Sequence, residues 1–360
     1  MGFDTFLGNA KALESVRGML ATGRVPGSLM FTGPDGVGKK TLALMLARAL
    51  NCERQTGDFC GECASCRKSE EMLSATRDDL ARRRESKDAQ RRVEGLVYFD
   101  LQLIEPITRY ILIEQIRQLR SVAYTRPFEL RRRVFVIDEA QAIHWQAVDL
   151  LLKVLEEPPE TTTLILVCSN AYELRPTIRS RCRRLAFQPV DDSLLSSLLA
   201  KEGRVPAAQR DLVVRIAAGS IARGKSFDAE EFTRQRRPWL DFLDVIATGA
   251  RDGRAVNWKG LFDSTKALAE NRNQFEDTLK TGYALLRDLL QVSVAGPNAN
   301  VANIDLASRL KVWSDRIGFK NIAKLKDGLD QAYRLQSRNV NQQLGLDVTA
   351  LDSLGSSFTE

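Results

Sequence analysis

The chain has 360 residues, of which 44% are hydrophobic and 28% are charged, with a net charge of +7 and a pI near 9.1. This length predicts two or three domains, and the longest apolar runs, such as residues 164–168, exclude a membrane span, which needs about 20 residues. Residues 1–9 lack the basic start and apolar centre of a secretion signal, so we expect a cytoplasmic protein. Its positive charge is compatible with contact with a polyanion but does not establish it.

Short apolar segments alternate with helical ones from residue 1 to about residue 189. The expected strands are Ser28–Thr32, Val97–Gln102, Val134–Asp138, Leu164–Cys168 and Arg184–Phe187. Strands that are separated by helical segments pair in parallel through crossover helices, and strands this apolar fit a sheet that is covered on both faces. The expected fold class is therefore α/β.

A glycine-rich segment, residues 33–41, lies between the first expected strand and a helical run. In the G-x-x-x-x-G-K-[ST] pattern the backbone surrounds phosphates, the lysine reaches the outer phosphates and the Ser/Thr hydroxyl binds Mg²⁺. The candidate nucleotide-binding residues here are Gly33, Gly36, Gly38, Lys39, Lys40 and Thr41. Lys40 stands where the hydroxyl is needed, and Thr41 is the next hydroxyl along the chain. The pattern predicts a phosphate-binding loop but leaves ATP hydrolysis open.

Four cysteines, Cys52, Cys60, Cys63 and Cys66, stand in a polar loop directly after that helical run. Four thiolates at this spacing suit a tetrahedral Zn²⁺ ion, and the reducing conditions of the cytosol argue against disulfides. Four protein ligands leave no open position for a catalytic water. We therefore expect a structural zinc module at residues 52–66.

Residues 74–95 carry many charges and no aromatic side chain. They lack the apolar surface that would order them against a core. A solvated helix or a mobile loop is therefore favoured over a nucleic-acid-binding arm.

Two carboxylates, Asp138 and Glu139, stand at the end of an apolar strand. In NTPases an Asp at this place binds Mg²⁺ and a Glu lies beside the attacking water. Asn170 follows the next expected strand, where it either senses a γ-phosphate or simply forms a turn. Together with the upstream loop, these residues predict a nucleotide-binding core.

Arg181 lies in the Ser-Arg-Cys sequence at residues 180–182, within a group of five arginines between residues 175 and 184. The planar guanidinium suits phosphate, so Arg181 is a candidate arginine finger that reaches the nucleotide of a neighbouring subunit. The alternative is a solvated basic face, which these residues alone favour.

The strands stop after Pro189, and the rest of the chain has helical periodicity. The expected domains are residues 1–189, a small helical domain at 190–227 and a larger helical domain at 228–348, followed by a frayed tail at 349–360. We expect the boundary between the helical domains within residues 224–238 and a Gly/Pro/Asn-rich break at residues 296–300.

The ordered motifs together resemble those of the bacterial DNA polymerase III clamp-loader ATPase subunits, members of the AAA+ family. They are Leu29–Pro34 leading into the loop, the four cysteines, Thr125–Phe128, Val136–Ala140, Leu151–Pro159 and Ser180–Cys182. The resemblance covers residues 1–226 well and extends more weakly to residues 338–346, which look like the terminal helix of the delta-prime type. It implies a P-loop NTPase-like sheet domain, a helical lid and an all-α collar.

The resemblance also implies a five-subunit spiral that opens the sliding clamp and places it on primed DNA. This chain would then assemble with gamma/tau-type and delta-type subunits, and Arg181 would act in trans on the nucleotide of its neighbour. Lys40 favours the delta-prime type, which generally does not hydrolyse ATP, because an ammonium cannot ligate Mg²⁺. Ala222 holds the place of the family's second-sensor arginine, with Arg223 next to it. The gamma/tau type remains the alternative, because Asp138 and Glu139 are intact.

Two other classes of function stay open. One is an autonomous AAA+ motor such as a branch-migration helicase, against which the cysteines and the helical C-terminal half argue. The other is a non-catalytic zinc adaptor that has kept the ATPase fold. Strong ATPase activity of the purified chain would favour the first, and failure to co-purify with clamp-loader subunits would favour the second.

Overall fold

The computed structural model describes residues 2–54, 57–88, 90–96, 98–252, 256–271, 274–296, 299–335 and 340–354. The chain divides into two compact units. The first consists of residues 1–197 and 218–223, and the second of residues 198–217 and 224–360. The division passes through helices α7 (Asp192–Glu202) and α9 (Ile221–Lys225).

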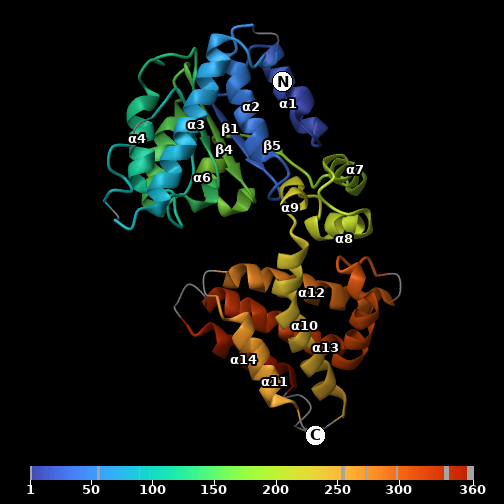
Figure 1. The fold of residues 1–360 in the computed structure, drawn as a ribbon. Coiled ribbons are helices and arrows are strands. Elements are labelled where there is room, and N and C mark those ends of the chain that lie inside the picture. Colours follow the sequence, from blue (N-terminus) through green and yellow to red (C-terminus); the bar gives the residue numbers. More distant parts are fainter. Residues whose placement is uncertain are drawn as a thin grey trace. The chain divides into compact units, whose positions relative to one another are not determined.

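The first unit is built on a five-stranded parallel sheet within the described residues (Figure 1). The strands are β1 (Ser28–Thr32), β2 (Leu101–Ile104), β3 (Arg133–Ile137), β4 (Thr162–Cys168) and β5 (Arg183–Ala186). Their order across the sheet is β2-β3-β4-β1-β5, so β1 pairs with the two strands that come last in the chain. The predicted α/β class is confirmed, and all strands end at one edge of the sheet.

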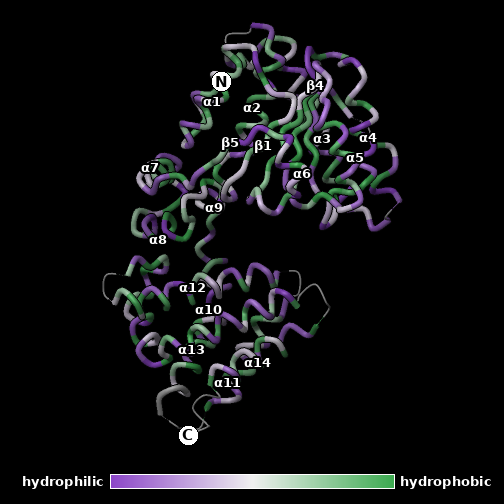
Figure 2. Tube along the Cα trace, turned by 180° about the vertical axis from the view of Figure 1, so that it is seen from behind, coloured by the Kyte–Doolittle hydropathy of each residue, from purple (hydrophilic) through white to green (hydrophobic). Residues whose placement is uncertain are grey.

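Helices cover both faces of this sheet. Helices α1 (Ala10–Ala21), α2 (Lys39–Asn51) and α3 (Ala64–Glu85) lie on one face, and α4 (Ile113–Ala123), α5 (Val148–Glu156) and α6 (Pro176–Arg179) lie on the other. Because successive residues of a strand point to opposite faces, Phe31 of β1 belongs to one buried cluster with Leu42, whereas Met30 belongs to the other with Leu151. Figure 2 shows hydrophobic residues concentrated along the strands. Burial on both faces explains why β1 and β4 are apolar, whereas three of the four residues of β5 are exposed.

Strand β2 starts later than the predicted Val97–Gln102. Val97 lies outside the described residues, and the residues that follow it contact other elements through their side chains, while the carbonyl oxygen of Asp100 accepts the backbone N–H of Val134 at 2.7 Å. The hydroxyl of Tyr98 donates to the carbonyl oxygen of Gln115 at 2.8 Å, and Asp100 binds the turn that precedes β3. The strand therefore begins only at Leu101.

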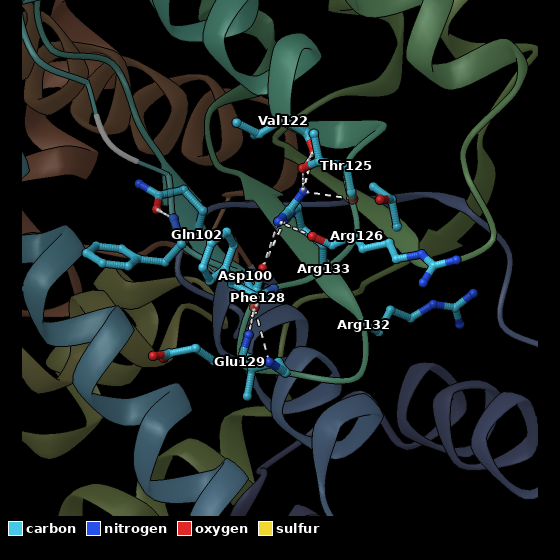
Figure 3. Close-up of polar contacts among 12 residues, drawn as sticks. Asp100, Gln102, Val122, Thr125, Arg126, Phe128, Glu129, Arg132 and Arg133 are labelled. Carbon is cyan, nitrogen blue, oxygen red and sulfur yellow. Dashed lines mark hydrogen bonds and ion pairs between the residues drawn. The ribbon is translucent and has the colours of Figure 1, made fainter.

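A buried ion pair between Asp100 and Arg133 fixes that turn (Figure 3). The two charged groups are 2.9 Å apart and their side chains are only 2% and 4% exposed. One oxygen of Asp100 accepts the backbone N–H groups of Phe128, Glu129 and Leu130 at 2.6 to 3.1 Å. Arg133 donates to the backbone carbonyls of Val122, Thr125 and Arg126. Both charges thus have partners inside the protein, which offsets their loss of water.

Residues 74–85 continue helix α3, as the favoured helical alternative predicts, but the expectation that residues 74–95 lack the surface to order themselves is wrong. Thr76 and Leu80 are buried, and even Arg83 is only 8% exposed. Its guanidinium pairs with Asp79 at 2.6 Å and donates to the carbonyl oxygens of residues 92, 94 and 95. Hydrogen bonds from Arg83, together with one from Arg92 to the carbonyl oxygen of Ser86 at 2.8 Å, hold the segment that follows the helix.

The second unit is helical throughout its described residues. Besides parts of α7 and α9, it contains α8 (Ala207–Ala217), α10 (Ala229–Asp252), α11 (Trp258–Leu268), α12 (Phe275–Ala295), α13 (Ala307–Leu335) and α14 (Gln342–Leu354). Its core is built around Trp239, Phe275 and Trp313. Gly282 lets α12 approach the Trp239 ring, since a Cβ there would lie 2.4 Å from it. Helix α13 is interrupted at Gly318, where φ is +74°.

The boundary expected within residues 224–238 falls in a shorter segment, and the expected start of the tail is wrong. Helix α10 begins at Ala229 and continues through Pro238, because its buried apolar face extends beyond the proline, so only residues 226–228 separate it from α9. The expected tail starts too early, because Ala350 and Leu354 are buried in the core and keep residues 349–354 in α14. Residues 355–360 lie outside the described residues.

The expected break at residues 296–300 follows α12, which ends at Ala295 and has Gly296 as its C-cap with φ +58°. Residues 297–298 lie outside the described residues. None of the helices in the described part of the chain is long and apolar enough to cross a membrane.

Candidate functional site

The residues singled out for nucleotide chemistry gather at the edge of the sheet where the parallel strands end. Strand β1 leads into the glycine loop and then into α2. Strand β2 ends before Glu105, and β3 ends before Asp138. Strand register therefore brings the loop and these carboxylates to one place.

The glycines of the loop are required by its conformation. Gly33, Gly36 and Gly38 have φ angles of +147°, +76° and +98°, which side chains rarely tolerate. A Cβ on Gly33 would lie 2.3 Å from the carbonyl oxygen of Phe187, and one on Gly36 would lie 2.1 Å from Ser220 Oγ. The loop has the tight path that the sequence pattern predicts.

Lys39 is folded back onto its own loop. It is 6% exposed, and its ammonium donates to the carbonyl oxygens of Gly33 and Pro34, the latter at 2.6 Å. Asp35 Oδ1 lies 3.5 Å from the same nitrogen. The backbone carbonyls of the loop thus accept the hydrogen bonds of Lys39, the lysine that the pattern assigns to phosphate.

Lys40 joins the ends of two strands. Its Nζ atom lies 2.8 Å from Glu105 Oε1 and 2.9 Å from Asp138 Oδ2. Burial by itself lowers the pKa of Lys40, but the hydrogen bond to Glu105 and the charge of Asp138 outweigh burial and raise it above its ordinary value. The other oxygen of Glu105 pairs with Arg84 of α3 at 2.9 Å. Lys40 is therefore a permanently charged member of this cluster.

These residues do not fit the Mg²⁺ ion that a phosphate loop of this type implies. Mg²⁺ requires oxygen ligands at about 2.0–2.1 Å in octahedral geometry. Here an ammonium without a lone pair is hydrogen-bonded to Asp138 at the position of the pattern's hydroxyl. Thr41 is exposed and lines a surface hollow together with Leu73 and Arg77 of α3.

Glu139 and Asn170 lie at the ends of neighbouring strands. Glu139 has a φ of +50°, which is uncommon for a residue with a side chain, and burial, together with the charges of Asp138 and Glu105, raises its pKa. Asn170 Oδ1 accepts the backbone N–H of Tyr172 at 3.0 Å. The asparagine forms a turn through Oδ1, and its contact with a γ-phosphate stays a prediction.

The first turn of α9 packs against the phosphate loop. The backbone N–H of Ala222 donates to the carbonyl oxygen of Gly36 at 3.1 Å. Arg223 is exposed, and its backbone N–H donates to Ser220 Oγ at 3.3 Å. Alanine, and not the neighbouring arginine, contacts the loop.

Arg181 is held by the chain's own residues directly after α6. Its guanidinium pairs with Glu156 Oε1 at 2.6 Å and donates to the carbonyl oxygen of Thr177 at 2.9 Å, while 33% of the side chain is exposed. The neighbouring Arg179 lies over the Tyr172 ring, 4.9 Å from its centroid. This basic group is therefore partly ordered by specific contacts rather than uniformly solvated.

The sulfur atoms of Cys52, Cys60, Cys63 and Cys66 all lie within 4.8 Å of one another. Cys52 follows α2, Cys63 precedes α3, and the first turn of α3 holds Cys66. A zinc ion with Zn–S bonds of about 2.3 Å holds its sulfurs about 3.8 Å apart, and those of Cys60 and Cys66 are 4.0 Å apart. The donor set and its spacing fit a closed tetrahedral zinc site.

Backbone N–H groups favour the thiolate form within this cluster. Glu62 and Cys63 donate to Cys60 Sγ at 3.5 and 3.3 Å and lower the pKa of Cys60 to about 6. Burial raises the pKa of Cys66 to about 12.

The remaining cysteines, Cys168 and Cys182, lie elsewhere, and burial raises their pKa values to about 11 and about 12. They have the character of ordinary buried thiols.

Sequence reasoning missed Glu105, Arg84 and Glu156. The signal for Glu105 is its place directly after an apolar strand, the same signal that identifies Asp138. Glu156 lies within the Leu151–Pro159 motif, but its pairing with Arg181 is visible only in the folded chain. Nothing in the charged run around Arg84 distinguishes it from its neighbours.

Comparison with known proteins adds the following similarities. Residues 8–191 match the family model described as DNA polymerase III, delta subunit. The chain is 30% identical over 239 residues to DNA polymerase III subunit gamma/tau of Mycobacterium tuberculosis (strain ATCC 25618 / H37Rv), covering 65% of this chain and 35% of that protein's length. It is 26% identical over 351 residues to subunit tau of Bacillus subtilis, covering 92% of this chain and 58% of that protein. A DNA polymerase III gamma subunit-related protein of Thermotoga maritima aligns over 96% of this chain and 99% of its own, with 15% identity and a TM-score of 0.45.

Proposed function

The chain belongs to the DNA polymerase III delta-subunit family, and from this membership we propose that it is a delta-prime-type subunit of a clamp loader. In this role it assembles in the cytoplasm with gamma/tau-type and delta-type subunits into a complex that loads the sliding clamp onto primed DNA. Its own nucleotide loop is degenerate. Its contribution to ATP hydrolysis is Arg181, which completes the active site of a neighbouring subunit.

The ion pairs of Lys40 with Glu105 and Asp138 carry the delta-prime assignment. An active NTPase of this class holds Mg²⁺ on a loop hydroxyl and on an Asp at the end of another strand of the same sheet. In this chain an ammonium takes the hydroxyl's position and is bound to that Asp. A subunit that does not hydrolyse ATP still contributes to catalysis when it presents a cationic group to its neighbour.

The contacts of Arg181 support a role as that cationic group. Glu156 and Thr177 fix the guanidinium while a third of the side chain remains exposed. A fixed guanidinium stabilises the charge that develops on a transferred phosphoryl group, and arginine fingers contribute about 10³ to 10⁵ in rate. A lysine would not reproduce the forked geometry.

We propose in addition that the cysteine cluster holds one structural zinc ion. The cluster's thiolates would be its four ligands, and the ion would cross-link the end of α2 to the start of α3. Because all four positions are filled by the protein, the site offers no place for a reacting water.

The second candidate is a gamma/tau-type subunit that hydrolyses ATP itself. The similarity to proteins named gamma/tau and tau favours it, as do the intact Asp138 and Glu139. Hydrolysis would then require Thr41 to supply the hydroxyl that Lys40 lacks.

Reconstitution with gamma/tau-type and delta-type subunits tests the proposal. We expect Arg181→Ala to assemble normally on a sizing column, to lose most clamp loading, and to lose ATP hydrolysis only in part, because other interfaces keep their own arginines. Arg181→Lys should not restore loading. Equal loading rates for wild-type and Arg181→Ala complexes, with assembly confirmed, would overturn the assignment. ATP turnover by the purified chain alone, abolished by Glu139→Gln, would favour the gamma/tau type.

A further inference from the structure

The charges at the ends of β2 and β3 form a cluster in which cations pair with carboxylates. Two carboxylates, Glu105 and Asp138, face two cations, Lys40 and Arg84. The carboxylate side chains are 13% and 14% exposed, and that of Lys40 is 45% exposed. Four elements meet here, because Lys40 comes from α2, Arg84 from α3 and the carboxylates from the ends of two strands.

We propose that Lys40 is the resident cation of this site, so that the native chain binds no divalent metal between Glu105 and Asp138 and has a stability that does not depend on one. The Nζ atom lies within 2.9 Å of an oxygen of each carboxylate, which is where a metal ligated by both would have to enter. Carboxylate oxygens at such a place suit Mg²⁺ or Mn²⁺ once no other cation neutralises them. The ammonium of Lys40 therefore neutralises the two carboxylates in place of a metal ion.

Arg84 and Glu139 determine how strongly the site depends on Lys40. Arg84 donates to Glu105 Oε2 and, at 3.0 and 3.1 Å, to the carbonyl oxygen of Pro106. Arg84 therefore neutralises only Oε2 of Glu105, and Oε1 is left to Lys40. Asp138 forms its ion pair with Lys40, and the Glu139 carboxylate next to it adds negative charge. Removal of the ammonium would leave Asp138 and Glu139 in mutual repulsion, which a divalent cation would relieve.

The test compares the wild-type full chain with Lys40→Met and Lys40→Arg in buffer freed of divalent cations. Methionine keeps the length of the stem and removes the charge, whereas arginine keeps the charge and serves as the matched control. Mn²⁺ binding is followed by electron paramagnetic resonance, and thermal unfolding is recorded with and without Mg²⁺.

We expect Lys40→Met to bind Mn²⁺ at least about tenfold more tightly than wild-type, since a unit charge at contact distance has been removed. Its unfolding temperature should fall without Mg²⁺ and recover with it, whereas wild-type and Lys40→Arg should show neither effect. A second change, Asp138→Asn, should abolish the gain. If Lys40→Met does not fold, Lys40→Ser is judged by the same criteria.

Tight Mn²⁺ binding by the wild-type chain, or no gain in the uncharged variants, would overturn this inference. Because both measurements use the isolated chain, their failure is separate from any failure of the clamp-loader proposal. A gamma/tau-type subunit would show both tight Mn²⁺ binding by the wild-type chain and ATP turnover.

Discussion

At the scale of single residues, the charged side chains of this protein act through fixed partners. Asp100 and Arg133 are nearly inaccessible, yet each has several hydrogen bonds. A buried pair of this kind adds little net stability compared with apolar residues of equal volume, but loss of one partner leaves the other charge buried alone. The consequence is a turn before β3 whose shape depends on one carboxylate.

We predict that Asp100→Asn destabilises the chain by about 3–5 kcal/mol. The amide removes the charge that neutralises Arg133, and it cannot accept on both of its polar atoms. Urea unfolding measures the loss, and hydrogen–deuterium exchange should accelerate in the peptide that contains Phe128. The exposed Asp78→Asn is the matched control and should change neither quantity.

The pH dependence of the same contact has a defined sign. Burial raises the pKa of Asp100, but the N–H groups of Glu129 and Leu130 and the Arg133 guanidinium outweigh burial and lower it below its ordinary value. The stabilisation is therefore present above the ordinary pKa of an Asp, about 3.9, and disappears as the pH falls through the lowered value. In Asp100→Asn the free energy of unfolding should vary less with pH in the acid range. The same acid-range pH dependence in the wild-type and variant chains would contradict the assignment of this stabilisation to Asp100.

Glu156 is predicted to position Arg181. Glu156→Ala should leave the chain folded and assembled while it lowers clamp loading by about tenfold, less than Arg181→Ala does, because the guanidinium keeps its bond to Thr177 but loses its ion pair. The adjacent and exposed Glu157→Ala is the control in the same motif. Equal effects of the two glutamate variants would argue against a positioning role.

At the scale of elements, the accuracy of sequence-based prediction depended on whether local pattern or tertiary contact determines a segment. Strand β1 is predicted to the residue because both of its faces are buried. Strand β2 starts late because Tyr98 and Asp100 bind other elements. Helix α10 passes through Pro238, with the buried Arg236 before the proline and the apolar core residues from Trp239 onward after it. No local pattern reveals contacts of this kind.

In the candidate site too, some features are set by local sequence and others by tertiary contacts. The glycine loop, the four cysteines and Asp138 have sequence signatures that reflect their chemistry. The pairings of Lys40 with Glu105 and of Arg181 with Glu156 join residues from different elements. Only the fold brings those partners together.

The start of α3 should depend on metal. We predict about one zinc ion per chain, and a ratio near zero in Cys63→Ser, because three thiolates and a hydroxyl no longer form the closed site. Elemental analysis of protein prepared without chelators measures the ratio. Cys182→Ser changes a cysteine outside the cluster and should retain the metal. A zinc content near zero in the wild-type chain would refute the site.

At the scale of the whole molecule, the structure predicts a chain that is catalytically silent by itself. The purified protein should hydrolyse ATP at no more than background rate, because the hydroxyl that anchors Mg²⁺ is replaced by Lys40. A phosphate-release assay on the isolated chain measures this, with Glu139→Gln as the control for contaminating activity. Turnover that Glu139→Gln removes would show that the loop is active after all.

The order of the strands also has a consequence in time. Strand β1 is complete at residue 32, but its two neighbours begin only at residues 162 and 183. A ribosome that adds about 5–20 residues per second needs roughly 7–27 s to advance from residue 28 to residue 162. For that interval Leu29, Met30 and Phe31 belong to a nascent chain that holds neither of their partners. The strand made first is therefore among the last to be enclosed, and the newborn chain must shield this apolar segment while most of the first unit is still being synthesised.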